Sequence, residues 1–170
     1  MSEIYTTCYN SPIGAIEISG TEDGLNTLYF RSDSCPGGNA IPGCLLNCIN
    51  QLDEYFKGKR QIFDLSLNPA GTDFQKRVWK ELINIPFGET ISYLELARRL
   101  GDAKAMRAVG GANGKNKISV IIPCHRVIGT NGKLTGYGGE LWRKQWLLNH
   151  ENSLAEFNIF DEVRIEYPLS

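Results

Sequence analysis

A cysteine followed by a histidine is the pair of residues in this sequence best suited to chemistry. Cys124 and His125 come directly after Pro123, at the end of the apolar run Ile-Ser-Val-Ile-Ile over residues 118–122. A cysteine is nucleophilic as its thiolate, so a neighbouring base or cation must help to remove the proton. His125 is such a base and Arg126 is such a cation. The alternative is a buried, inert cysteine, because free cysteine is among the most buried residue types.

The apolar run predicts the element that positions this cysteine. Residues 118–122 are rich in β-branched side chains, which is typical of a buried strand. Pro123 would end that strand because proline lacks the N–H that the next ladder bond needs. We therefore expect Cys124 to stand at the rigid end of a strand.

Helical patterns precede this stretch. Thr72-x-x-Gln75 and Ser92-x-x-Glu95 are capping boxes, each opening a helix. A short turn then leads from the second of these helices into residues 103–112, which is helix-turn-helix spacing. Segment 103–112 is nearly bare of large side chains. Such a helix suits either close helix packing or DNA contact, and the spacing leaves both readings open.

The chain divides into three segments by composition. Residues 1–68 predict a small α/β domain with a hairpin, a helix over 45–56 and a further strand over 63–67. The stretch Asn-Pro-Ala-Gly at 68–71 separates it from a second domain over 69–152, where an Asn-Gly pair predicts that 127–129 and 133–135 form a hairpin. Residues 153–170 form an acidic and apolar extension, which we expect to pack on the body of the protein.

Charge is distributed unevenly over these segments. The whole chain has a formal net charge of -1, yet residues 69–152 carry thirteen basic and seven acidic side chains. The first segment carries four basic and eight acidic side chains, and the last carries one and four. A basic middle segment fits a phosphate-binding surface, although a charged run usually marks an ordinary solvated face.

The cysteine count argues against stabilising cross-links. The five cysteines are odd in number, show no Cys-x-x-Cys spacing and are accompanied by two histidines. We expect neither a disulfide framework nor a zinc site, and we expect Cys44 and Cys48 to pack in the core. No apolar run reaches the roughly 20 residues of a membrane span, and the start lacks a signal-peptide pattern. We expect a cytoplasmic protein, or a nuclear one in a eukaryote.

Several motifs together resemble one family. The string Pro-Cys-His-Arg-Val at 123–127 resembles the active-site signature of the O6-alkylguanine-DNA alkyltransferases, also called methylated-DNA-protein-cysteine methyltransferases. The similarity includes residues 107–113, 135–139 and 146–151 and spans roughly 72 to 151. It implies an α/β (α+β) fold, with a ribonuclease H-like N-terminal domain built on an antiparallel sheet and a winged-helix-like helix-turn-helix domain.

The resemblance also implies a reaction, which is stoichiometric transfer of the alkyl group from O6-methylguanine, and from O4-methylthymine, to Cys124. Glu151 would hydrogen-bond His125, which draws the proton from the thiol through a water. Tyr93 would promote rotation of the nucleotide and donate a hydrogen bond to the flipped guanine. Asn116 would be the hinge between the recognition helix and the cysteine.

DNA contacts follow from the same resemblance. Arg107 would enter the base stack in place of an extruded nucleotide, with its helix in the minor groove, because the alkylated oxygen lies inside the duplex. The residues expected to contact DNA are Arg107, Tyr93, Ala108, Gly110, Gly111 and Arg126. The residues expected to line the base pocket are Val127, Tyr137 and Gly138.

The implied partner is double-stranded DNA containing alkylated bases, bound by a monomer without a cofactor. Some relatives bind zinc in the N-terminal domain, but this chain lacks those ligands, so we expect no metal. One alternative is a non-catalytic sensor of alkylated DNA, which would lack the cysteine. Another is a helix-turn-helix regulator, which would need neither the corner at Cys124 nor Glu151. A cysteine hydrolase fits less well because no oxyanion motif accompanies Cys124.

Overall fold

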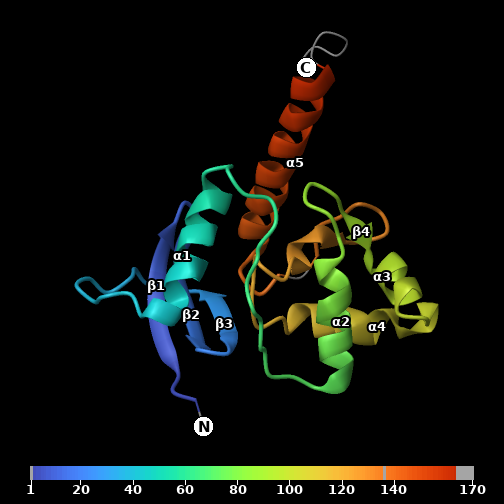
Figure 1. The fold of residues 1–170 in the computed structure, drawn as a ribbon. Helices are drawn as coiled ribbons and strands as arrows, with labels where there is room; N and C mark the ends of the chain where they lie inside the picture. The colour runs from blue at the N-terminus through green and yellow to red at the C-terminus, as the bar shows by residue number, and fades with distance from the viewer. Residues whose placement is uncertain (1, 136, 164–170) are drawn as a thin grey trace.

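The computed structural model describes residues 2–135 and 137–163 of the 170-residue chain, without the side chains of 155–163. An antiparallel sheet opens the fold, with β1 (Tyr5–Ser11), β2 (Gly14–Thr21) and β3 (Gly24–Phe30) in the order β1-β2-β3. Helix α1 (Gly43–Phe56) lies against this sheet (Figure 1). The α/β character of the N-terminal segment, with its hairpin and its helix, is therefore confirmed.

The alternating pattern of the strands explains how α1 covers the sheet. Ile16, Ile18 and Leu28 are fully buried on the sheet, and Leu45 and Leu52 are fully buried on the helix. Burying a large aliphatic side chain stabilises the fold by roughly 1.5–3 kcal/mol, so this layer supplies much of the domain's stability.

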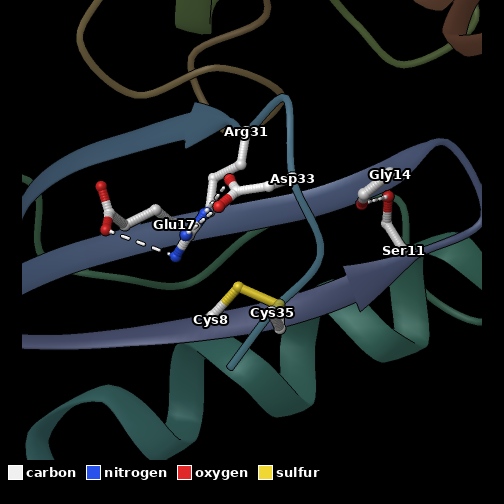
Figure 2. The surroundings of a disulfide bond; sticks show 7 residues. All are labelled: Cys8, Ser11, Gly14, Glu17, Arg31, Asp33 and Cys35. Atoms are coloured by element: carbon white, nitrogen blue, oxygen red, sulfur yellow. Dashed lines mark hydrogen bonds and ion pairs between the residues drawn. A yellow bond between two sulfur atoms is a disulfide. The ribbon is translucent and has the colours of Figure 1, made fainter. Parts of the chain in front are cut away.

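One disulfide is present, although the cysteine count led us to expect no disulfide framework. Cys8 on β1 is bonded to Cys35 in the loop that follows β3, with 5.6 Å between their Cα atoms (Figure 2). The sequence could not reveal this pair, because the two positions meet only through the order of the strands. Cys48 is buried and Cys44 is half-buried against the core, as expected.

The predicted strand over 63–67 is wrong. Leu67 makes only an isolated bridge with Leu25, through the bonds Leu25 N–H to the Ser66 carbonyl (2.9 Å) and Asn68 N–H to the Leu25 carbonyl (2.7 Å). The alternation of this segment comes from one apolar side packing on the core, without a continuous partner strand.

The second half begins with a capped helix. α2 (Asp73–Ile83) starts at the predicted capping box, in which the Gln75 N–H donates to Thr72 Oγ1 (3.1 Å) and the Thr72 N–H donates to Gln75 Oε1 (3.0 Å). The Trp79 indole N–H then donates to the Ala112 carbonyl (2.9 Å). This bond ties α2 to the helix-turn-helix unit.

The helix-turn-helix unit consists of α3 (Tyr93–Arg99), the short 3-10 turn η1 (Ala103–Ala105) and α4 (Met106–Gly114). Ser92 caps α3 by accepting from the Glu95 N–H (3.0 Å). Val109 and Ala112 are buried on α4. One face of α4 is thus used for packing, and the other is left for solvent or a partner.

The predicted strand before Cys124 is wrong, because residues 118–122 form consecutive turns. Ile118 makes only an isolated bridge with Leu28, and Val120 has a left-handed φ of 71°. The Asn116 side chain accepts from the Ile118 N–H (3.0 Å) and donates to the Ile122 carbonyl (2.7 Å). These bonds satisfy backbone groups that a neighbouring strand would otherwise pair.

After these turns the chain forms the 3-10 turn η2 (Cys124–Arg126) and the strand β5 (Val127–Ile128). β5 pairs in parallel with β4 (Ile91–Ser92). The predicted pairing of 127–129 with 133–135 as hairpin strands is wrong, because residues 133–135 form no strand. The two segments are joined by a turn in which the Gly129 N–H donates to the Lys133 carbonyl (2.8 Å). The pairing of β5 with β4 therefore places the segment that follows Cys124 beside the residues that lead into α3.

The long helix α5 (Leu141–Val163) completes the fold and runs through residue 152, where we expected the body to end (Figure 1). Leu154 on this helix lies beside Gly58, at the end of α1. The expected packing of the tail concerns side chains outside the described residues. No helix in the described parts of the chain combines the length and the apolarity needed to cross a membrane.

Candidate active site around Cys124

Cys124 lies in a buried cradle of hydrogen-bond donors. It is 5 % exposed, and burial raises the pKa of its thiol. The Asn116 side chain, the Lys144 ammonium and the backbone N–H groups of Cys124 and His125 lower that pKa in turn. The resting sulfur is therefore a protonated thiol, surrounded by groups that stabilise a thiolate once the proton leaves.

His125 and Glu151 form a buried pair, as the resemblance to the alkyltransferases implies. His125 Nε2 lies 2.7 Å from Glu151 Oε2, and the side chains are 0 % and 1 % exposed. His125 Nδ1 has no hydrogen-bond partner among the described residues. Burial would raise the pKa of Glu151, but His125 and Arg126 hold it well below its usual range. The carboxylate thus orients the imidazole and leaves its other nitrogen open to a proton.

Arg126 requires a correction, because it is not available to DNA. Its Nε donates to Glu151 Oε1 (2.7 Å), its Nη2 to Glu151 Oε2 (3.1 Å) and its Nη1 to the Ile85 carbonyl (2.7 Å). The residue is only 7 % exposed. A guanidinium bound in this way compensates a buried carboxylate, so Arg126 belongs to the interior of the site.

Sequence reasoning missed two buried residues of this site. The Tyr55 hydroxyl donates to Glu151 Oε2 (2.6 Å), and Lys144 Nζ donates to the carbonyls of Val127 (2.6 Å) and Thr135 (3.0 Å). Burial lowers the pKa of Lys144 to about 8, while Cys124 acts to raise it. Helical spacing could have placed Tyr55 on the buried face of α1, but no sequence pattern marks a buried lysine.

The expected base-pocket residues lie around the same sulfur. Val127 is fully buried and Tyr137 is partly buried against the core, and burial first and then Cys124 raise the pKa of the Tyr137 phenol well above its usual value. The Tyr93 hydroxyl donates to the Thr135 carbonyl (3.1 Å). Gly138 is exposed. The start of α3 and the loop after β5 therefore meet beside Cys124.

The expected DNA-contact residues of α4 lie on its outer side. Arg107, Ala108 and Gly111 are exposed, whereas Gly110 is partly covered by the Tyr93 ring. A side chain added at Gly111 would meet nothing within 4 Å. This bare side of α4 can approach another surface closely, with Arg107 as its long cationic side chain.

In residues 2–135 and 137–163, no group of three or more histidine, cysteine, aspartate or glutamate side chains is placed to hold a metal ion.

Two family models match the chain over almost all of its length. Residues 4–69 match the ribonuclease-like domain of 6-O-methylguanine DNA methyltransferase, and residues 73–153 match its DNA binding domain. A methylated-DNA–protein-cysteine methyltransferase of Mycobacterium tuberculosis is 44 % identical over 164 residues, which is 93 % of this chain and 99 % of the relative. One from Methanosarcina mazei is 47 % identical over 159 residues, covering 89 % and 99 %.

Solved structures give the same relationship. The crystal structure of the M. tuberculosis O6-methylguanine methyltransferase superposes with a TM-score of 0.81 at 43 % identity, covering 93 % of this chain and 99 % of the other. The M. tuberculosis OGT in complex with DNA gives 0.79 at 47 % identity, covering 86 % and 92 %. The chain therefore belongs to the 6-O-methylguanine DNA methyltransferase family.

Proposed function

We propose that this protein repairs DNA by moving the alkyl group from O6 of a guanine to Sγ of Cys124, once per protein molecule. The names of its relatives and the DNA complex of one of them support this function. The observation that carries the assignment to Cys124 is the buried His125–Glu151 pair next to it, with His125 Nδ1 unpartnered among the described residues.

The chemistry proceeds by one displacement. Glu151 holds Nε2 of His125, so the thiol proton passes to Nδ1, through a water where the gap requires one. The thiolate attacks the alkyl carbon, and the S–C bond forms as the C–O bond breaks. The electron pair of that bond passes to the guanine, which takes back one proton and becomes ordinary guanine.

Transfer inactivates the protein, because the alkylated thiol of Cys124 is not regenerated. Water hydrolyses an acyl-enzyme and so frees its nucleophile. It does not hydrolyse a thioether in this way, because the alkyl carbon would have to expel a thiolate, which is a poor leaving group. The repaired DNA leaves and Cys124 stays alkylated. One molecule of protein is consumed for each repaired base.

The target base must leave the duplex before the sulfur can reach it. The bare outer side of α4 supports entry into the minor groove, with Arg107 filling the vacancy in the stack. Tyr93 would crowd the backbone of the rotating nucleotide, and Val127, Tyr137 and Gly138 would receive the base. In this arrangement α4 opens the duplex and the loop after β5 holds the base for transfer.

Replacement of Cys124 tests the assignment. Cys124→Ser should keep affinity for a duplex containing O6-methylguanine and lose methyl transfer, because a serine hydroxyl is far harder to ionise than a thiol. The readouts are a binding titration and chromatography of the digested oligonucleotide. Cys48→Ser, at a buried cysteine of α1, is the matched control and should transfer at the wild-type rate. Full transfer by Cys124→Ser would place the acceptor elsewhere.

A further inference from the structure

Tyr55 connects the N-terminal domain to the Glu151 carboxylate. It lies on α1, is 0 % exposed, and donates its hydroxyl to Glu151 Oε2 at 2.6 Å. Burial raises the pKa of Tyr55 well above its usual value, and Glu151 raises it further, so the hydroxyl remains a donor at any physiological pH. Four aromatic or imidazole rings surround its own ring, namely those of Phe56, Phe63, Phe87 and His150.

Oε2 of Glu151 is shared among three donors. Besides Tyr55, it receives His125 Nε2 at 2.7 Å and Arg126 Nη2 at 3.1 Å. Each donor to a carboxylate oxygen withdraws electron density from it and so weakens it as an acceptor for the others. The strength of the Tyr55 bond therefore affects how well Glu151 stabilises a protonated His125.

We propose that Tyr55 is a positioning residue of the proton relay, which fixes Glu151 Oε2 in line with His125 and moderates its pull on the imidazole. The inference rests on the proposed function and extends it, because a residue of the ribonuclease-like domain then completes the site of the DNA-binding domain. Tyr55 thus acts on the relay through Glu151, to which its hydroxyl donates.

A purely structural role makes a different prediction. If the ring matters only for packing, removal of the hydroxyl changes stability and leaves the pH dependence of transfer unchanged. If the hydroxyl moderates Glu151, its removal strengthens the bond from Glu151 to the imidazolium. The half-maximum of the low-pH limb of the rate profile then moves to higher pH.

Several charged or titratable groups face the relay and must stay constant in the test. Besides Tyr55 itself, they are Cys124 and Arg126 from η2, His150 and Lys144 from α5, and Tyr137 from the loop after β5. Tyr55→Phe removes one hydroxyl and keeps the charge of every one of them. A shift of the limb in this variant is therefore due to that hydroxyl.

The experiment measures the single-turnover rate of methyl transfer from an O6-methylguanine duplex between pH 5.5 and 9. Tyr55→Phe should move the low-pH limb up by about half a pH unit, the size expected for one hydrogen bond. Tyr9→Phe is the matched control, since the Tyr9 hydroxyl donates to the Asp53 carboxylate (3.1 Å) in the same domain. Its limb should coincide with that of the wild type.

Replacement of Tyr55 by 3-fluorotyrosine keeps the hydroxyl and makes it a stronger donor, so the limb should move to lower pH. This variant also serves if Tyr55→Phe does not fold. Limbs that coincide with the wild type in the folded variants, or that move equally in Tyr9→Phe, would overturn the inference. Absence of transfer by the wild-type protein would instead overturn the proposed function.

Discussion

Cys124 depends on neighbours that oppose the effect of its burial. Burial shields the Cys124 sulfur from water, but it also raises the pKa of the thiol. The Asn116 side chain, two backbone N–H groups and the Lys144 ammonium act in the opposite direction. The site therefore keeps the nucleophile protected at rest and makes its ionisation possible once a proton acceptor is in place.

Lys144 is the one cation among these neighbours, and its removal should be measurable at the sulfur. Lys144→Met should raise the pKa of the Cys124 thiol and slow methyl transfer about tenfold. The thiol pKa is measured from the pH dependence of its alkylation by iodoacetamide. In the wild type this help should fade as the pH rises through about 8, where burial has placed the pKa of Lys144. Lys133→Met, at an exposed lysine of the neighbouring loop, is the control. An unchanged thiol pKa in Lys144→Met would contradict an electrostatic role.

Replacement of Arg107 distinguishes a role in base extrusion from a role in the transfer reaction. Arg107→Ala should slow repair of a duplex by more than tenfold while leaving the reaction with free O6-methylguanine base nearly unchanged, because only the duplex leaves a vacancy to fill. Lys104→Ala, at another exposed cation of the same unit, should weaken DNA binding without this selectivity. Equal losses on both substrates for Arg107→Ala would move this residue into the chemistry.

Elements with local signals were predictable, and elements defined by distant contacts were not. The Thr72 cap and the buried face of α1 follow from spacing alone, and both are found. The strand predicted over residues 118–122 was wrong because a continuous apolar run has the same sequence pattern whether the buried segment is extended or turned. The turned conformation is stabilised by the Asn116 side chain, which hydrogen-bonds backbone groups that a neighbouring strand would have paired.

The same distinction applies within the site. Cys124 and His125 are adjacent in sequence, and the resemblance of residues 146–151 to a known family identified Glu151. Tyr55 lies 96 residues from Glu151, so only the packing of α1 against α5 shows that they bond. Arg126 was misassigned because a charged residue beside a DNA-binding motif usually faces solvent, whereas here a buried carboxylate binds it.

The Cys8–Cys35 disulfide makes a prediction about the first element of the sheet. It closes a segment with a sequence separation of 27 residues and anchors the loop after β3 to β1. The double variant Cys8→Ser/Cys35→Ser should lower the free energy of unfolding by about 3 kcal/mol, because the unfolded chain regains loop freedom. Thermal melting with and without a reducing agent checks this.

The wild type should lose stability on reduction, and the double variant should not respond. Cys44→Ser is the control for loss of an unpaired cysteine. Free thiol reactivity of Cys8 and Cys35 in the unreduced protein would contradict the cross-link.

At the scale of the molecule, the two halves share one core and one relay. Buried residues of both halves form a single apolar cluster, which includes Ile16, Leu45, Val78 and Leu147. Tyr55 and Glu151 extend this connection to the active site. The N-terminal half is therefore expected to matter for activity as well as for stability.

The C-terminal tail gives a prediction about charge. Residues 155–170 carry four acids and one arginine. If the tail packs away from the basic surface, truncation after Leu154 should lower the melting temperature and leave DNA affinity and its salt dependence nearly unchanged. A truncated protein that binds DNA much more tightly at low salt would show instead that the tail competes with phosphate.

The stoichiometry of methyl transfer tests single-turnover repair by Cys124. The protein is mixed with a several-fold excess of an O6-methylguanine duplex, and its intact mass and peptide map are recorded together with the number of repaired bases. Single-turnover repair predicts one methyl group per protein molecule, located on Cys124, and one repaired base for each protein added. More than one repaired base per protein, or a methyl group on Cys44 or Cys48, would contradict it.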